Sequence, residues 1–266
     1  MYGLKQAPLL WNKHIHGTLT EIGFKRHAGE YGLYFRDCKD GIALVALVAL
    51  YVDDLLITSP SPEVTSKIKN ALNRYYSMKD LGQVKKFLGL NIEQDDKKVS
   101  LSLHDYICQA ASSSGVDTSR TVTTPLSKDI PIFDDQSPPL PDITVYQSIV
   151  GQLLFISNTG RPDVAHSISL LSRFLKDPRE IHLRAAHRVM QYLYATRHHG
   201  LVYHMGSPIE LQIYSDASHG STTDIPHATR GYILPVMQCR REGDVCSTTE
   251  NTKLFNTKSF GSNVIP

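Results

Sequence analysis

The sequence predicts an α+β protein, because strand-like and helix-like stretches occupy separate parts of the 266-residue chain. Apolar and β-branched runs bounded by turn residues predict strands over residues 31–59, 86–103 and 200–236. Apolar residues at helical spacing predict three successive helices over residues 145–197. The composition, with 41% hydrophobic and 20% charged residues, is that of an ordinary globular protein.

Charge and cysteine content narrow the functional classes. The net charge of +2 is close to neutral, so contact with nucleic acid would need a local basic cluster. The apolar run over residues 42–52 is shorter than the roughly twenty residues of a membrane helix, so no membrane partner is expected. The four cysteines contain no C-x-x-C pair, which indicates a reduced intracellular compartment. A zinc site is an alternative that fits no standard spacing, and its ligands would be Cys239, Cys246, His219 and His227.

Taken in order, the chain begins with a predicted helix over residues 7–23. A strand follows over residues 31–35. A second helix is predicted after Ser61-Pro62-Glu63, because this triplet supplies an N-cap, a proline at the first helical position and an acid in the first turn. We expect this helix to pack against the strands that precede it.

Residues 41–59 form the most informative stretch of the first half. Two apolar runs surround Asp53 and Asp54, which predicts a hairpin with buried arms and a doubly charged turn. Because buried arms fix the position of the turn, a divalent cation is a natural counter-charge for the two carboxylates. The alternative is an ordinary turn that uses aspartate for its backbone preferences.

The middle of the chain predicts a strand pair, a helix and a linker. Residues 86–92 and 99–103 should pair around a turn at residues 95–98, and a short helix should follow over residues 105–114. Residues 124–144 are rich in proline, which predicts an extended linker between two domains.

Three helices are predicted after this linker, over residues 145–157, 163–176 and 179–197. The last two carry an excess of basic residues that could follow a phosphate backbone, although a solvated helix face has the same composition. These residues are Arg173, Lys176, Arg179, Arg184, Arg188 and Arg197. The final third returns to strands, and Asp216 lies at the end of an apolar one, either as a metal ligand or as a strand terminator.

Several motifs in this order resemble the reverse transcriptase of copia-type long-terminal-repeat retrotransposons, most of all the yeast members. They are YGLKQAP at residues 2–8 with Trp11-Asn12, YVDD at residues 51–54, KDLG at residues 79–82 with FLGL at residues 87–90, YQSIVG at residues 146–151 with GRPD at residues 160–163, and SDA at residues 215–217. The match runs over most of the chain.

The resemblance implies roles for individual residues. Asp53 and Asp54 would be the catalytic carboxylates that bind Mg²⁺, or Mn²⁺ in its place, for two-metal nucleotidyl transfer. Gln6 would lie beside the incoming nucleotide and Lys5 would reach a phosphate. The residues of the primer grip would be Phe87, Leu88, Gly89 and Leu90.

The resemblance also implies a domain order. Residues 1–123 would be a partial palm and thumb without fingers, residues 124–144 a linker, and residues 145–199 a helical connection. Residues 200–266 would be an incomplete ribonuclease H-like mixed sheet, with Asp216 and Glu250 as metal ligands. The implied partners are an RNA template, a DNA primer, deoxynucleoside triphosphates and other parts of the Pol polyprotein. The implied location is the cytoplasm, inside virus-like particles, or the nucleus.

The sequence also departs from the family pattern. The family carries a third catalytic carboxylate upstream of YGLKQAP, where this sequence has no residue. Thr252 stands where a second glutamate is expected after Glu250. We therefore expect a fragment truncated at both ends, derived from an RNA-directed DNA polymerase and inactive by itself. The alternatives are a non-catalytic nucleic-acid-binding remnant, a chain that forms no stable protein, and an intact enzyme whose reading frame extends upstream.

Overall fold

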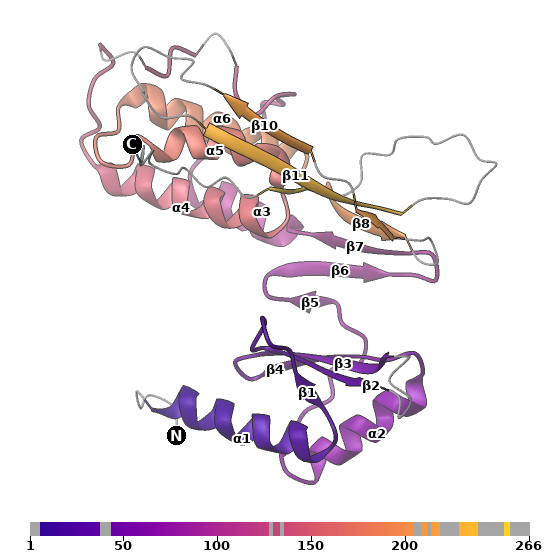
Figure 1. Cartoon of the computed structure of the whole chain (residues 1–266). Coiled ribbons are helices and arrows are strands. Elements are labelled where there is room, and N and C mark those ends of the chain that lie inside the picture. The colour runs from indigo at the N-terminus through magenta and orange to yellow at the C-terminus, as the bar shows by residue number, and fades with distance from the viewer. Residues whose placement is uncertain are drawn as a thin grey trace, which may run out of the picture. The chain divides into compact units, whose positions relative to one another are not determined.

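The computed structural model describes residues 6–37, 44–127, 130–133, 136–204, 209–211, 214–218, 229–238 and 253–255. The chain divides into two compact units, Met1–Val84 and Lys85–Pro266, which are described separately (Figure 1). Helices and strands occur in both units, and the strand pairings of the described residues are antiparallel. The predicted α+β class is therefore confirmed.

The first unit is a four-stranded sheet with two helices on one face (Figure 1). Its elements are α1 (Ala7–Glu21), β1 (Lys25–Arg26), β2 (Leu33–Asp37), β3 (Leu44–Tyr51), β4 (Asp54–Thr58) and α2 (Pro62–Asn73), with the strands in the order β1-β2-β3-β4. Side chains from both helices, from β2 and β3, and from the connection between α1 and β1 form its core. The core residues are Ile15, Leu19, Phe24, Tyr34, Ala46, Val48, Ile68 and Leu72.

Local sequence explains the two helices of this unit. Pro8 lies in the first turn of α1, where a missing backbone N–H costs no intrahelical bond. The Ser61 side chain accepts a hydrogen bond from the Val64 backbone N–H at 3.4 Å, and Pro62 and Glu63 follow in the first turn of α2. Both helices were predicted, α1 from apolar residues at helical spacing and α2 from its N-terminal triplet.

The described residues of the second unit include four α-helices packed around one core. They are α3 (His104–Ser113), α4 (Ile143–Thr159), α5 (Ala165–Ser172) and α6 (Glu180–Ala195), and a short 3₁₀ helix (Pro162–Val164) precedes α5. Within α4, Tyr146, Ile149, Val150 and Leu153 are buried, as the helical spacing predicted, and Leu154 is half-buried beside them.

A four-stranded sheet belongs to the same unit. Its strands are β5 (Lys86–Phe87), β6 (Leu90–Gln94), β7 (Lys98–Ser102) and β8 (Gly200–His204), in the order β5-β6-β7-β8. The prediction of one strand over residues 86–92 is wrong, because Leu88 and Gly89 have φ of 52° and 83° and form a two-residue turn. β8 pairs with β7, so this strand joins a hairpin from much earlier in the chain rather than the strands that follow it. Sequence periodicity identifies a strand but does not choose its partner.

The last described strands form a further sheet. They are β9 (Ile209–Leu211), β10 (Tyr214–Ser218), β11 (Thr229–Gln238) and β12 (Lys253–Phe255), and β11 pairs with each of the others. The sequence predicted a mixed sheet here, whereas the pairings between the described strands are antiparallel. Parallel neighbours need a crossover connection, and β10 and β11 are instead consecutive antiparallel strands.

The proline-rich residues 124–144 are not an extended linker in the structure. Ile132 and Ser137 are buried, and the Ile132 carbonyl lies 2.9 Å from His182 Nε2 of α6. The Ser137 Oγ accepts from the backbone N–H of Ile181, and the Pro138 carbonyl accepts from that of Glu180. Prolines disfavour helix and strand, but the apolar residues between them still drive the segment onto the helices.

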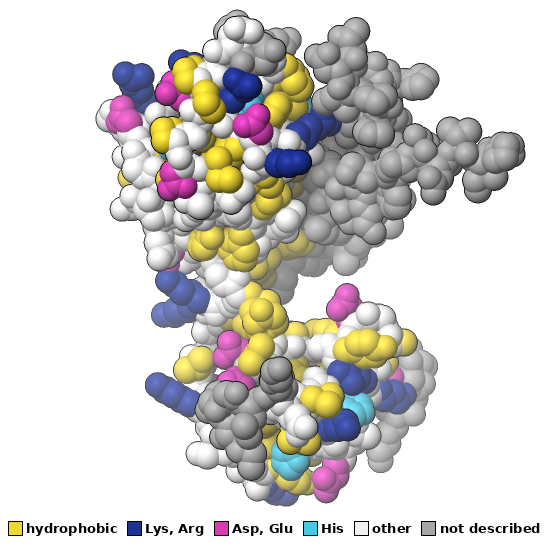
Figure 2. Space-filling model, turned by 90° about the vertical axis from the view of Figure 1, so that its left-hand side faces the viewer, with side chains coloured by type: hydrophobic (Ala, Val, Ile, Leu, Met, Phe, Trp, Pro, Cys, Tyr) yellow, Lys and Arg dark blue, Asp and Glu magenta, His cyan; other side chains and the backbone are white. Residues whose placement is uncertain are grey.

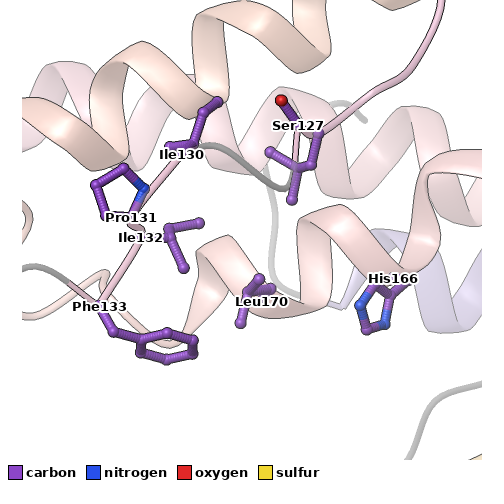
Figure 3. Close-up of a pocket in the computed structure, with 8 residues that line it drawn as sticks. Ser127, Ile130, Pro131, Ile132, Phe133, His166 and Leu170 are labelled. Atoms are coloured by element: carbon purple, nitrogen blue, oxygen red, sulfur yellow. The ribbon is translucent and has the colours of Figure 1, made fainter.

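A shallow pocket of about 550 Å³ lies between this segment and α5. Figure 3 shows Ile132, Phe133, His166 and Leu170 among its lining residues, with the last two on α5.

The division of the chain after Val84 falls inside residues 1–123, which the sequence predicted to be one domain. No described helix has the length and apolar character needed to cross a membrane.

Candidate metal-binding hairpin

The turn between β3 and β4 contains the two residues Val52 and Asp53. Tyr51 pairs with Asp54 across it, and Leu50 pairs with Leu55 in the next position. Tyr51 and Val52 are 54% and 65% exposed, and Asp53 and Asp54 are exposed as well. The structure therefore confirms the predicted hairpin and places both carboxylates at its exposed tip.

Val52 adopts an unfavourable backbone conformation. Its φ is 53°, in the left-handed region that β-branched residues rarely occupy. Two-residue hairpins with positive φ at the first turn position favour glycine there. Keeping valine in this conformation costs on the order of 1–3 kcal/mol, so the surrounding structure must hold it in place.

The arms of the hairpin are rigid because the core holds them. Ala46 and Val48 of β3 are buried, and Leu55 and Ile57 of β4 pack against the same core. The Leu50 backbone N–H donates to the Gly32 carbonyl at 2.7 Å, which joins β3 to the start of β2. The tip is therefore a fixed projection of the sheet and not an independent loop.

Trp11 of α1 contacts the turn directly. Its indole Nε1–H donates a hydrogen bond to the Val52 carbonyl oxygen at 2.7 Å. The indole ring packs edge-on against Tyr76, with the ring centroids 5.3 Å apart. The Tyr76 hydroxyl lies 2.7 Å from the Thr18 Oγ1, so α1, the turn and residue 76 form one connected group.

The chemistry of the two carboxylates fits a magnesium ion. Mg²⁺ prefers oxygen ligands and usually takes one or two carboxylates together with waters and substrate phosphates. Within the described residues, no group of three or more His, Cys, Asp or Glu side chains could enclose a metal. Asp53 and Asp54 are both exposed, so a cation bound to their carboxylates would keep further coordination positions for other ligands.

A second pair of adjacent aspartates provides a comparison. Asp95 and Asp96 lie between β6 and β7 and are also exposed. Backbone N–H groups of Lys97 and Lys98 donate to the Asp95 carboxylate at 2.7 and 2.8 Å, and these bonds hold the pKa of Asp95 below its usual value. Asp95 thus stabilises its own turn, beside two lysines that supply positive charge.

The predicted nucleotide-binding residues are only partly described. Gln6 is exposed and caps α1 through its backbone carbonyl, which accepts from the Leu10 N–H at 3.0 Å. It precedes Trp11 on the helix that contacts the Val52 carbonyl. Lys5 lies outside the described residues.

The predicted primer grip forms the β5–β6 hairpin of the second unit. Leu88 at its turn is 42% exposed, whereas Leu90 packs against the helical core. Lys86 forms an ion pair with Asp105, and Asn91 Nδ2 donates to the same carboxylate at 3.0 Å. The bonds from Lys86 and Asn91 lower the pKa of Asp105. The hairpin is thus fastened to the start of α3.

The other predicted metal ligands lie mostly outside the described part of the chain. Asp216 lies on β10 opposite Gly231, and its side chain is not among those described. Glu250 is outside the described residues. The four residues of the alternative zinc site are also outside them, namely Cys239, Cys246, His219 and His227.

The basic residues of α5, α6 and their connection do not all face solvent. Arg179 Nη1 donates to the Ser137 carbonyl at 2.8 Å, and Arg197 Nη1 donates to the Tyr194 carbonyl at 2.9 Å. Arg188 Nη2 donates to Thr124 Oγ1 at 3.1 Å. Arg173, Lys176 and Arg184 are exposed. On the face shown in Figure 2, Lys and Arg side chains are scattered among acidic and apolar ones.

Sequence reasoning did not find the link between Trp11 and the hairpin. Trp11 belongs to the first motif and Val52 to the second. They are 41 positions apart, and no local sequence signal indicates that they are in contact. The pairing exists because α1 packs on the sheet that ends in the turn.

Comparisons with known proteins show which class of protein this chain is similar to. Residues 1–128 match the model of the reverse transcriptase (RNA-dependent DNA polymerase) family. A transposon Ty5-1 protein of Saccharomyces cerevisiae is 57% identical over 234 residues, which cover 88% of this chain and 75% of that protein. The Pol polyproteins from transposon RE1 of Arabidopsis thaliana and transposon TNT 1-94 of Nicotiana tabacum are 32% and 29% identical, and each alignment covers 88% of this chain.

The chain belongs to the copia-type retrotransposon Pol family. It aligns with 16% and 18% of the lengths of the two plant polyproteins, so it corresponds to a part of them. No solved structure matches the chain.

Proposed function

We propose that this chain carries part of an RNA-directed DNA polymerase site, with Asp53 and Asp54 as its divalent-cation ligands. The observation that carries the proposal is the position of the two carboxylates, side by side at the exposed tip of a core-anchored hairpin. This hairpin lies inside the residues that match the reverse transcriptase family.

The residues present fit Mg²⁺, and Mn²⁺ has the same preference for carboxylate oxygen. When bound in such a site, the cations activate the primer hydroxyl and neutralise the triphosphate. Asp53 and Asp54 contribute negative charge at a fixed position, and the buried arms keep that position constant. Their exposure leaves room for the phosphates and waters that complete the coordination.

The remaining roles follow from the family. Gln6 and Lys5 are proposed to contact the incoming nucleotide, and residues 87–90 to contact the primer end. Asp216 and Glu250 are proposed as ligands of a ribonuclease H site. The substrates would be an RNA template, a DNA primer and deoxynucleoside triphosphates, and other Pol parts would be partners.

We expect the 266 residues to bind metal without sustaining DNA synthesis. Polymerisation by the family uses a third carboxylate besides the two in YVDD. Fixed charge at the metal site supplies much of the acceleration in such reactions, so two carboxylates should bind cations more weakly and catalyse poorly.

The test is a titration of the full chain with Mn²⁺, in which electron paramagnetic resonance measures the bound and free ion. Asp53→Asn and Asp54→Asn should each weaken binding at the hairpin. Asp95→Asn and Asp96→Asn are matched controls, because they remove the same charge from another exposed hairpin and should leave the affinity unchanged. Equal effects of all four substitutions would show that only net charge matters and would overturn the site.

Primer extension on an RNA template tests the polymerase assignment separately. We expect extension near background with the wild-type chain. Sustained synthesis that is lost in Asp53→Asn would confirm the site and refute the expected inactivity. A salt-dependent affinity for an RNA–DNA hybrid that is unchanged in Asp53→Asn would instead favour the non-catalytic nucleic-acid-binding alternative.

A further inference from the structure

The hydrogen bond from Trp11 reaches the central peptide of the β3–β4 turn. The Val52 carbonyl belongs to the peptide that joins the two turn residues, Val52 and Asp53, and the indole N–H donates to it at 2.7 Å. Turns of different type differ chiefly in the direction of this peptide. A donor fixed on this carbonyl therefore selects one turn conformation over the others.

The selected conformation is one that Val52 disfavours. Its φ of 53° places a β-branched side chain in the left-handed region, where glycine is the usual residue. Because this conformation is strained, the turn would relax if nothing held it. Relaxation would change the direction of the peptide that precedes Asp53. Because Asp53 and Asp54 follow this peptide, their carboxylates would move with it.

The donor itself is firmly held. Ile15 and Leu19, on the same helix as Trp11, are fully buried in the core of the first unit. The indole ring is half-buried and packs edge-on against Tyr76. Tyr76 is fixed in turn by its hydroxyl contact with Thr18 Oγ1 at 2.7 Å and by an edge-on contact with the His14 ring.

We propose that Trp11 is a positioning residue, whose indole N–H holds the strained Val52 turn in the conformation that presents Asp53 and Asp54 to a divalent cation. The inference rests on the proposed metal-binding function of the hairpin. It assigns Trp11 no contact with substrate, and it predicts that the turn conformation itself depends on the indole N–H.

Trp11→Phe removes the donor and keeps an aromatic ring against Tyr76. We expect this variant to fold, to lose the left-handed backbone chemical shifts of Val52, and to bind Mn²⁺ about fivefold more weakly, as expected for one net hydrogen bond. The matched control is Thr65→Val, which removes the 2.7 Å contact between the Thr65 and Ser59 hydroxyls in the same unit but leaves the indole bond and its Tyr76 packing in place. Its Mn²⁺ affinity should stay within about twofold of wild type.

A second substitution at Val52 distinguishes a positioning role of Trp11 from a merely structural one. Glycine adopts the left-handed conformation without strain, so Val52→Gly should make the turn independent of Trp11. In the Val52→Gly background, Trp11→Phe should change the Mn²⁺ affinity by less than about twofold. A general packing defect at Trp11 would persist in that background.

Nuclear magnetic resonance separates this inference from the proposed function. Trp11 is the single tryptophan of the sequence, so its indole N–H gives one resonance, which should exchange slowly with solvent without any metal. Trp11→Phe with wild-type Val52 shifts and wild-type Mn²⁺ affinity would overturn the inference. If Asp53→Asn has no effect on Mn²⁺ binding, the proposed function fails, and the metal-free spectra still decide whether Trp11 holds the turn.

Discussion

Replacing Arg161 by methionine should destabilise the second unit strongly. Arg161 is 2% exposed and links two segments of the chain. Its Nε and Nη2 donate to both oxygens of Asp163 at 2.9 and 2.8 Å, and Nη1 and Nη2 donate to the carbonyl and hydroxyl of Thr196 at 3.0 and 2.7 Å. The guanidinium thus ties the start of the 3₁₀ helix to the C-terminal end of α6.

The expected loss of stability follows from the Asp163 carboxylate, which the substitution leaves without its arginine partner. Removing one partner of a fully buried ion pair costs about 3–5 kcal/mol. The Asp163 side chain is 40% exposed, so water recovers part of this cost, and we expect a loss of about 2–3 kcal/mol. With a urea dependence of about 2 kcal/mol per molar, the unfolding midpoint should fall by about 1–1.5 M.

Urea unfolding followed by far-ultraviolet circular dichroism measures this change. Arg173→Met is the control, because Arg173 is an arginine of the same unit that is not buried. Adding Asp163→Asn to Arg161→Met should recover part of the loss by removing the unpaired charge. A midpoint shift no larger than that of Arg173→Met, or no recovery in the double variant, would refute the reasoning.

Three further predictions concern pH, a helix cap and a pair of glycines. Burial lowers the pKa of His182 below 6.5, so its contribution to stability is present above about pH 6.5 and is lost as the pH falls toward the folded-state value. The urea midpoint of the second unit should therefore fall on acidification, and His182→Leu should flatten this dependence. Ser61→Ala should cost the first unit about 1 kcal/mol in melts followed by tryptophan fluorescence, whereas Ser66→Ala, exposed on the same helix, should cost little. Gly200→Ala should disrupt the β7–β8 pairing, because its Cβ would lie 2.2 Å from a backbone oxygen, and amide exchange should show this loss. Gly151→Ala meets open space in α4 and should stabilise the protein by up to about 1 kcal/mol.

Residue type and spacing were sufficient for the local elements. The N-cap at Ser61, the apolar spacing in α4 and the two apolar arms around Asp53 are properties of short stretches, and short stretches are where capping and periodicity act. The turn at Leu88 and Gly89 was missed, although the glycine at its second position is the signal for it. The motifs also indicated the family, because their residue types and their order along the chain are properties of the sequence alone.

The tertiary structure decided what depends on distant residues. It packed Ile132 and Ser137 of the proline-rich segment against α6, paired β8 with β7, and brought Trp11 to the Val52 carbonyl. Neither periodicity nor composition predicts these contacts, because the local sequence preferences of each segment would be satisfied with a different partner as well. The sequence by itself determined that two adjacent carboxylates lie at the tip of the hairpin. The fold of α1 onto the sheet determined what holds that turn in a conformation that valine alone would not adopt.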